Sequence, residues 1–188
     1  AARRAQLSRM LAERQPSSPV VVIPPSLPWS SSTLASRPRR WASTLASQGC
    51  LVFYCDPQHL AENSNAFPEV EPNVFVANVP LPVYDVVESP LVLADARNLT
   101  QLAAFRQPRV IYDCLDGAGG TDSSSLHPEW LARAEVIVVP SVAIQGAVAA
   151  WRPDAMVVAD EVESWQDLGR QALAAVAKPA DPARLPAL

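Results

Sequence analysis

Short apolar runs recur along the chain and are separated by longer polar segments. The runs are rich in valine, isoleucine and leucine and lack polar alternation, which is typical of strands buried on both faces. They read PVVVIP, CLVFYCD, NVFVANV, PLVLAD, RVIYDCLD, EVIVVPS and AMVVAD, at residues 19–24, 50–56, 73–79, 90–95, 109–116, 135–141 and 155–160. The pattern therefore predicts six to seven short strands.

The polar segments between the runs predict helices. The second helix is expected to begin after a cap at Ser32 or Thr33 and to end at Gly49, whereas residues 57–72 are expected to form a loop. Strands that alternate with helices indicate an α/β fold, a doubly wound and mostly parallel sheet with helices on both faces (Rossmann-like). The expected helices cover residues 3–15, about 33–48, 98–106, 126–133, 142–151 and 164–177.

A length of 188 residues suits one domain of this class. We expect residues 1–18 to form an N-terminal helical arm or linker and residues 19–178 to form the α/β domain. Residues 179–188, KPADPARLPAL from Lys178 on, have the composition of a linker that leads toward a further domain. Since the chain does not begin with Met, we take it as a processed chain or as a piece of a longer one.

Charge and hydropathy exclude several classes of function. The net charge is −4 and 18% of residues are charged, so the chain has no general attraction for nucleic acid or an anionic membrane. The basic cluster of Arg37, Arg39 and Arg40 is too small to reverse this. No apolar run reaches the roughly 18 residues that span a bilayer. We therefore expect no nucleic-acid partner, membrane association that is at most peripheral, and a cytoplasmic location.

The cysteines and histidines do not form a reactive or metal-binding pattern. Cys50, Cys55 and Cys114 lack CxxC spacing and lie in or beside apolar runs, which is typical of buried thiols in a reducing compartment. His59 and His127 are far apart and neither belongs to an HExxH motif. We expect no metal site.

Ligands of doubly wound sheets bind beyond the carboxyl ends of the strands. The segment after the first strand, IPPSLPWSSSTLAS at residues 23–36, is rich in proline and serine where many nucleotide-binding folds have glycine. It contains neither GxGxxG nor GxxxxGK[ST], and no GxSxG motif occurs elsewhere. A bound dinucleotide, a P-loop phosphate site and a serine hydrolase are therefore disfavoured. An oxidoreductase or a flavodoxin-like protein would need to bind NAD or FMN without these motifs.

Four segments, taken in order, resemble the N-terminal domain of bacterial glycosyltransferases of the GT-B class, families 1 and 4. RPRRWASTLASQGCLVFYCDP resembles RPxxLAxxLAxxGHxVLYVxP, and RVIYDCLDG resembles a strand and turn that end in VYDCxDD. HPEWLARAEVIVVPSVAI is similar to LLARADLVVxxSxxL, and PDAMVVADEVE stands where the family has PNVxxIPNGVD. The resemblance spans roughly residues 19–165.

This resemblance implies the acceptor side of a two-domain enzyme. In that family a second Rossmann-like domain holds most of the nucleotide-sugar donor, and its Glu-x7-Glu donor motif would lie beyond residue 188. The expected function is transfer of a sugar to a cell-envelope or exopolysaccharide acceptor, a glycan or glycolipid, in polysaccharide biosynthesis. We expect no cofactor in this domain, a nucleotide-sugar donor in the full-length protein, and no activity of this part alone.

Two aspartates are the candidate catalytic residues. Asp113 and Asp116 stand at a strand end and the following turn, where a carboxylate serves as the base that removes a proton from the acceptor hydroxyl. The alternative is structural, because Asp often caps turns and helix starts. Gly117 replaces the second aspartate of the family's DD pair, which weakens the catalytic role of Asp116.

The segment after the first strand supplies the candidate substrate-binding residues. Trp29 offers a ring face to a sugar, and Ser31, Ser32 and Thr33 offer hydroxyl groups near a helix start. Arg37 matches the family's RP pair and either binds a phosphate or carboxylate of the substrate or pairs with a local acid. We interpret the segment as an acceptor-side loop; the alternative is that it is scaffolding.

In the family, the motif NGVD leads out of the first domain. This chain has a more acidic sequence at that place. Asp160, Glu161 and Glu163 stand at this place and would repel a nucleotide diphosphate. Either the donor does not approach this edge, or the domain is a noncatalytic Rossmann-like binding or assembly unit of a larger multidomain protein. Both possibilities stay open at the level of the sequence.

Overall fold

The structure, a computed structural model, describes residues 2–14, 18–25, 27–31, 36–57, 67–77, 81–114, 128–158 and 162–178. The described chain contains eight strands in the order β3-β4-β2-β1-β5-β6-β7-β8. Strand β3 is antiparallel to β4, whereas the pairs β1–β2, β1–β5, β2–β4, β6–β7 and β7–β8 are parallel. The predicted fold class, a doubly wound and mostly parallel α/β sheet, is confirmed.

The chain divides into two compact units, which we describe separately. Unit 1 comprises Ala1–Val92 with Thr100–Pro108, and unit 2 comprises Leu93–Leu99 with Arg109–Leu188. The elements of unit 1 are α1 (Ala2–Glu13), β1 (Val20–Ile23), η1 (Trp29–Ser31), α2 (Arg37–Ser47), β2 (Leu51–Cys55), β3 (Glu69–Glu71), β4 (Val74–Ala77) and α3 (Leu81–Val86). Strand β5 (Leu91–Ala94) pairs with β1 through Leu91 and Val92, and η2 (Leu99–Ala104) follows it.

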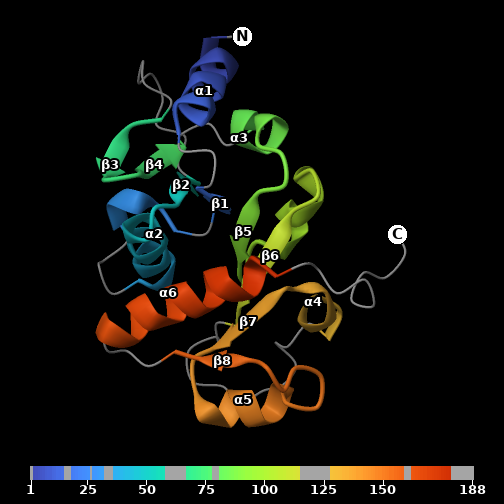
Figure 1. The fold of residues 1–188 in the computed structure, drawn as a ribbon. Coiled ribbons are helices and arrows are strands. Elements are labelled where there is room, and N and C mark those ends of the chain that lie inside the picture. The colour runs from blue at the N-terminus through green and yellow to red at the C-terminus, as the bar shows by residue number, and fades with distance from the viewer. Residues whose placement is uncertain are drawn as a thin grey trace. The chain divides into compact units, whose positions relative to one another are not determined.

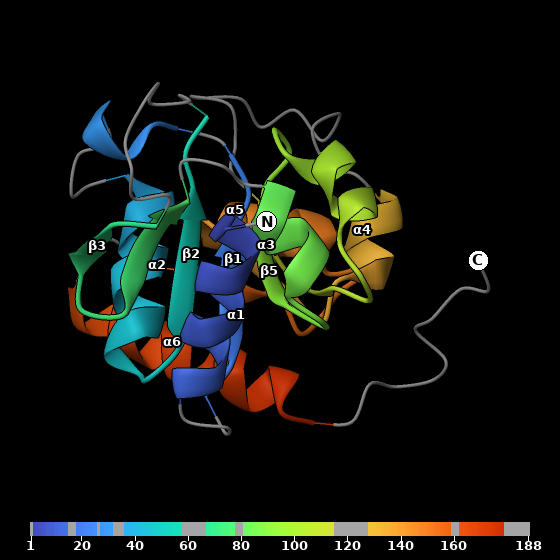
Figure 2. The same ribbon diagram turned by 90° about the horizontal axis from the view of Figure 1, so that it is seen from above.

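Unit 1 is built in layers around the two strands β1 and β2, in which every residue is buried. Helix α2 covers one face of β1, β2 and β4, and its Trp41 is fully buried. Helices α1 and α3 pack against each other on the other side, where Leu7 of α1 is also fully buried (Figures 1 and 2). The turn between α2 and β2 contains Gly49 at φ +86°, a backbone conformation that glycine adopts without strain.

Unit 2 has the same layered construction. Its elements are β6 (Arg109–Asp113), α4 (Pro128–Arg133), β7 (Val136–Val139), α5 (Val142–Val148), β8 (Met156–Val157) and α6 (Val162–Val176). All four residues of β7 are buried, and α5 and α6 both pack against this strand. Helices α5 and α6 lie on opposite sides of β7 and β8 (Figure 1).

Two arginines of unit 2 satisfy the carbonyl groups at helix ends. Arg152 is only 4% exposed and donates to the carbonyl oxygens of Leu131, Ala134 and Glu135 at 2.9, 2.6 and 3.1 Å, at the end of α4. Its guanidinium also pairs with Asp154 at 2.8 Å. Arg109 pairs with Glu135 and donates to the carbonyl oxygens of Val176 and Lys178, at the end of α6. The last carbonyl oxygens of a helix have no partner within the helix, so the two guanidinium groups supply hydrogen-bond donors to them.

Several elements differ from the sequence-based expectation. Strand β3 lies in the segment predicted to be a loop and brings the number of strands to eight. It was missed because it is short and charged, with the sequence Glu-Val-Glu. Helix α3 was missed because its prolines indicated irregular chain, yet Pro82 occupies the second helical position, where no N–H is needed. Helix α2 begins at Arg37 with Ser36 as N-cap, later than the cap expected at Ser32 or Thr33, which lie outside the described residues.

The predicted domain boundaries at residues 18 and 178 stay predictions, and the tail 179–188 lies outside the described residues. The helix expected over residues 98–106 is the shorter 3-10 helix η2. Among the helices that the structure describes, none is both long and apolar enough to cross a membrane.

Candidate functional site

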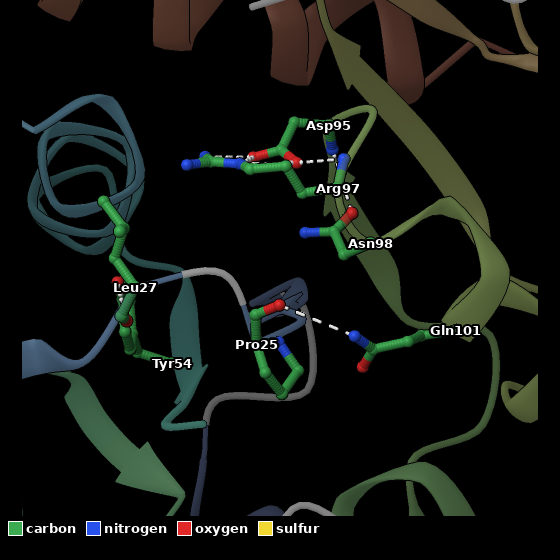
Figure 3. A network of polar contacts seen from close by, with 7 residues as sticks. All are labelled: Pro25, Leu27, Tyr54, Asp95, Arg97, Asn98 and Gln101. Carbon is green, nitrogen blue, oxygen red and sulfur yellow. Dashed lines mark hydrogen bonds and ion pairs between the residues drawn. The ribbon is translucent and has the colours of Figure 1, made fainter. Parts of the chain in front are cut away.

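The carboxyl edge of the strands in unit 1 holds a fixed loop, which we call the β1 loop: residues 24–31, described except for residue 26. Three side chains bind its backbone. The Tyr54 hydroxyl donates to the carbonyl oxygen of Leu27 at 2.7 Å (Figure 3). The side-chain amide nitrogen of Gln101 donates to the carbonyl oxygen of Pro25 at 3.5 Å. The backbone N–H of Trp29 donates to Oδ2 of Asp56 at 3.0 Å. The loop is thus held at three points along its length.

The three anchoring side chains come from segments that the sheet brings to one edge. Tyr54 is on β2, paired in parallel with Ile23 at the end of β1, and Asp56 directly follows β2. Asp56 is only 4% exposed, so its carboxylate has little access to water and its hydrogen bond to Trp29 is shielded. Gln101 is on η2, 76 positions after Pro25. All three contacts that hold the loop come from residues far from it in the sequence.

Gln101 is itself oriented by a buried neighbour. The Tyr84 hydroxyl donates to Oε1 of Gln101 at 3.0 Å, which leaves the amide nitrogen to face Pro25. Tyr84 also shares a side-chain hydrogen bond with the buried Cys55. Burial raises the pKa of Tyr84, with a further contribution from Cys55, and burial raises the pKa of Cys55 to about 12. Both groups are therefore neutral at pH 7 and act as hydrogen-bonding groups.

Trp29 is the central aromatic residue of the β1 loop. Its ring meets that of Tyr54 edge to face, with centroids 5.1 Å apart. The guanidinium of Arg39, on α2, lies 4.3 Å from the centroid of the Trp29 ring. Arg39 in turn pairs with Glu71 of β3 at 3.1 Å, and the Ser43 hydroxyl donates to the other carboxylate oxygen of Glu71. Arg39 of α2 thus contacts the half-buried Trp29 ring, and Glu71 of β3 holds Arg39 in turn.

The other substrate-binding candidates have varied outcomes. Ser31 ends η1, and the half-buried Arg37 is the first residue of α2, so both belong to unit 1 together with Trp29. Ser32 and Thr33 lie outside the described residues. The structure gives Arg37 a helical position in the first turn, and its role toward a substrate stays a prediction.

The catalytic candidates fall in unit 2. Asp113 is the last residue of β6 and is buried, whereas Asp116 lies outside the described residues. The pKa of the neighbouring Tyr112 is raised first by burial, then by Cys114, Asp95 and Asp113. Asp95 and Asp113 thus both contribute to the raised pKa of Tyr112, and the role of Asp113 as a base stays a prediction.

Asp95 forms a closed turn after β5. Its Oδ1 accepts from the backbone N–H of Arg97 at 2.8 Å, and Arg97 Nη2 lies 2.5 Å from Oδ2 (Figure 3). The buried Asn98 accepts from the Asp95 N–H at 2.9 Å and donates its own N–H to the Asp95 carbonyl at 3.1 Å. Asp95, Arg97 and Asn98 thus form hydrogen bonds with one another, which indicates a structural role for this turn.

Sequence reasoning did not identify Tyr54, Gln101, Arg39 or Glu71 as parts of the loop's surroundings. Tyr54 lies in an apolar run and was counted as part of a buried strand. Gln101, Arg39 and Glu71 belong to no local sequence pattern that would mark them as contacts of the loop. Within the described ranges, no group of three or more His, Cys, Asp or Glu side chains is arranged to hold a metal ion.

Burial of the thiols and phenols predicts a loss of stability at high pH. The pKa of Cys50 is raised by burial from 9.0 to about 11, and that of Cys55 to about 12, while Tyr84 and Tyr112 are raised in the same direction. In the unfolded chain the thiols lose their protons near pH 9, so above that pH the unfolded state binds fewer protons than the folded state. We expect these groups to leave the free energy of unfolding unchanged between about pH 7 and 8, and to lower it as the pH rises toward 10.

Urea unfolding at about pH 7 and pH 10 measures this effect. A variant with Cys50→Ala and Cys55→Ala lacks the two thiols and is expected to show a smaller fall between these pH values. Equal stability at both pH values in the unsubstituted protein would contradict the linkage.

Comparison with known proteins gives one likeness. No family model matches the chain, and no curated protein matches it. A solved structure of a sucrose-phosphate synthase from Thermosynechococcus elongatus is similar at 15% sequence identity and a TM-score of 0.45. The alignment covers 82% of this chain and 94% of that one. The fold class stated above rests on the strands and helices of this chain alone.

Proposed function

We propose that this chain is the acceptor-side Rossmann-like domain of a GT-B glycosyltransferase, and that the β1 loop binds the acceptor glycan. The observation that carries the proposal is the fixed position of Trp29 at the carboxyl edge of unit 1. Its N–H is held by Asp56, its ring contacts Tyr54, and the guanidinium of Arg39 lies over it. A rigid aromatic ring at this edge binds a sugar face with little loss of conformational freedom on binding.

The positions of the family-like segments support the same proposal. RPRRWASTLAS forms α2 and LVFYC forms β2, so the segment that resembles the family is a helix followed by a buried parallel strand. RVIYD forms β6, and PEWLAR followed by VIVV forms α4 and β7. These three of the four segments are helices and strands in the order that the resemblance implies.

The proposed role divides the chemistry between two domains. This chain would position the acceptor, with Asp113 and Asp116 as candidates for the base that takes the proton from its hydroxyl group. The donor, a nucleotide sugar, would be held mainly by a second Rossmann-like domain of the full-length protein. The acceptor class would be a cell-envelope or exopolysaccharide glycan, and the site of action cytoplasmic.

Replacing Trp29 by alanine tests the glycan site. We expect the variant to bind oligosaccharides about tenfold more weakly, since one sugar face loses its aromatic partner. Saturation-transfer difference NMR with a panel of neutral and acidic oligosaccharides measures binding. Trp151→Ala is the matched control, because Trp151 is 55% exposed and belongs to unit 2. The proposal fails if no oligosaccharide binds, or if both variants lose binding equally.

A second candidate function is a noncatalytic binding or assembly domain. It is favoured by the acidic sequence at 160–163, where Asp160 and Glu161 lie outside the described residues and Glu163 is in α6. An assay of the full-length protein with labelled nucleotide sugars and a bound oligosaccharide separates the two. Sugar transfer supports the enzyme, whereas glycan binding without transfer supports the noncatalytic domain.

A further inference from the structure

The turn after β5, in unit 2, holds the side-chain amide of Asn98 in one orientation. Asn98 is only 1% exposed, and its Oδ1 accepts the backbone N–H of Asp95 at 2.9 Å. An amide oxygen accepts hydrogen bonds whereas an amide nitrogen only donates them, so this contact also fixes the direction of Nδ2. The Asn98 amide therefore presents two N–H donors in a fixed direction.

Nδ2 of Asn98 has no hydrogen-bond partner among the residues that the structure describes. It points away from the backbone of the turn, to the side on which the Arg97 guanidinium lies (Figure 3). Asp95 does not need it, because both of its carboxylate oxygens already accept from Arg97. A buried polar group without a partner is costly, and an oxygen atom from outside the turn would remove that cost.

Asn98 lies at the edge of the sheet where ligands of this fold class bind. Asp95 directly follows β5 and Asp113 ends β6, so the turn stands at the carboxyl ends of two neighbouring strands. Asp95 and Asp113 both contribute to the raised pKa of Tyr112, so the turn and the end of β6 are close together. The donors of Asn98 are thus in a place where a bound substrate is expected.

The charges around the turn favour an uncharged ligand group. Asp95 and Arg97 form an ion pair without net charge, and Asp113 adds a buried carboxylate at the same edge. A phosphate or carboxylate of a ligand would be repelled by Asp113. An ammonium group has only donors and cannot accept from the Asn98 amide. A hydroxyl group accepts this hydrogen bond and brings no charge.

We propose that the Asn98 amide binds a hydroxyl oxygen of a neutral sugar and is a specificity-determining residue for the glycan. This inference rests on the proposed function, to which it adds the class of sugar and a binding residue in unit 2. A sugar without the matching hydroxyl leaves the two N–H donors unpaired, and a charged sugar meets the Asp113 carboxylate. Both are discriminated against for these separate reasons.

Asn98→Ser tests the amide without opening the turn. The serine hydroxyl can still accept the Asp95 N–H, but the side chain has no amide nitrogen. The probes are the methyl glycosides of glucose, mannose and galactose, with that of glucuronic acid as the charged probe. We expect a neutral glycoside to shift the NMR signals of the Asn98 side-chain amide protons saturably, and Asn98→Ser to bind it about fivefold more weakly. The charged probe should bind more weakly than the neutral one.

Monodeoxy derivatives of the bound glycoside identify the hydroxyl group. The derivative that lacks the hydroxyl at Asn98 should bind the unsubstituted protein about fivefold more weakly, and Asn98→Ser should not weaken its binding further. Derivatives that lack another hydroxyl should keep the full effect of Asn98→Ser. If the substitution weakens the binding of every derivative equally, the amide does not bind a sugar hydroxyl and the proposal is wrong.

Asn73→Asp is the matched control, because it removes an exposed side-chain amide in unit 1, and it should bind as the unsubstituted protein does. Glycoside binding that Trp29→Ala weakens and Asn98→Ser leaves unchanged would overturn this inference alone and leave the proposed function standing. Tighter binding of the charged probe than of the neutral ones would overturn the assignment of a neutral sugar. If none of the glycosides binds, the inference and the proposed function both fail.

Discussion

Replacing Arg152 by methionine is expected to lower the free energy of unfolding by about 3 kcal/mol. Arg152 donates to three backbone carbonyls at the end of α4, and its guanidinium pairs with Asp154. Methionine keeps most of the apolar stem but leaves those carbonyls without their donor in a buried place, and such groups cost about 1–3 kcal/mol each when they are left unpaired. Water reaching some of them reduces the sum.

Urea unfolding followed by circular dichroism measures the change. Arg170→Met is the control, because Arg170 pairs with Asp167 on the exposed surface of α6, where an ion pair contributes less than about 1 kcal/mol. A loss in Arg152→Met no larger than that in Arg170→Met would show that the carbonyls at the end of α4 do not depend on the guanidinium.

Replacing Asp56 by alanine is expected to cost about 2 kcal/mol and to release the middle of the β1 loop. The buried carboxylate accepts the N–H of Trp29 at 3.0 Å, and alanine offers no acceptor there. Tyr54 and Gln101 would still hold the loop at Leu27 and Pro25. The effect should therefore be local: faster hydrogen exchange at the Trp29 amide, measured by NMR, with little change in the strands.

Asp56→Asn is the matched control for this experiment. Its side-chain carbonyl oxygen still accepts a hydrogen bond, so it should retain more of the stability and of the protection of the Trp29 amide than Asp56→Ala does. If the Trp29 amide exchanges at the same rate in the unsubstituted protein and in Asp56→Ala, the loop is held by other contacts and the assignment of Asp56 as an anchor is wrong.

Most strands of the sheet could be predicted because buried strands need apolar residues, and these residues stand out as short runs in the sequence. Runs such as VVVI and VIVV have β-branched side chains on both faces, which is typical of a parallel strand covered on both sides. Strand β3 lacks this signature, since Val70 stands between two glutamates and is partly exposed. Helix α3 has prolines at and before its start, a signal shared by loops and by first helical turns.

The candidate site was only partly predictable. The position of Trp29 after the first strand follows from the rule that ligands bind beyond strand carboxyl ends. What holds Trp29 does not follow from local sequence, because Glu71 and Arg39 are 32 positions apart and Gln101 is 76 positions from Pro25. These contacts form only when segments far apart in the sequence come together in the fold, and no single segment specifies them.

The short strand β3 has a consequence for the behaviour of the protein at high concentration. Without it, the apolar strand β4 would present an open row of N–H and C=O groups that a second molecule's strand could pair with. β3 covers this row with three residues, and two of them are glutamates. In the tight turn before β4, the backbone N–H of Asn73 donates to Oε1 of Glu69 at 2.9 Å. We therefore expect the hairpin to reduce pairing of β4 with a strand of a second molecule.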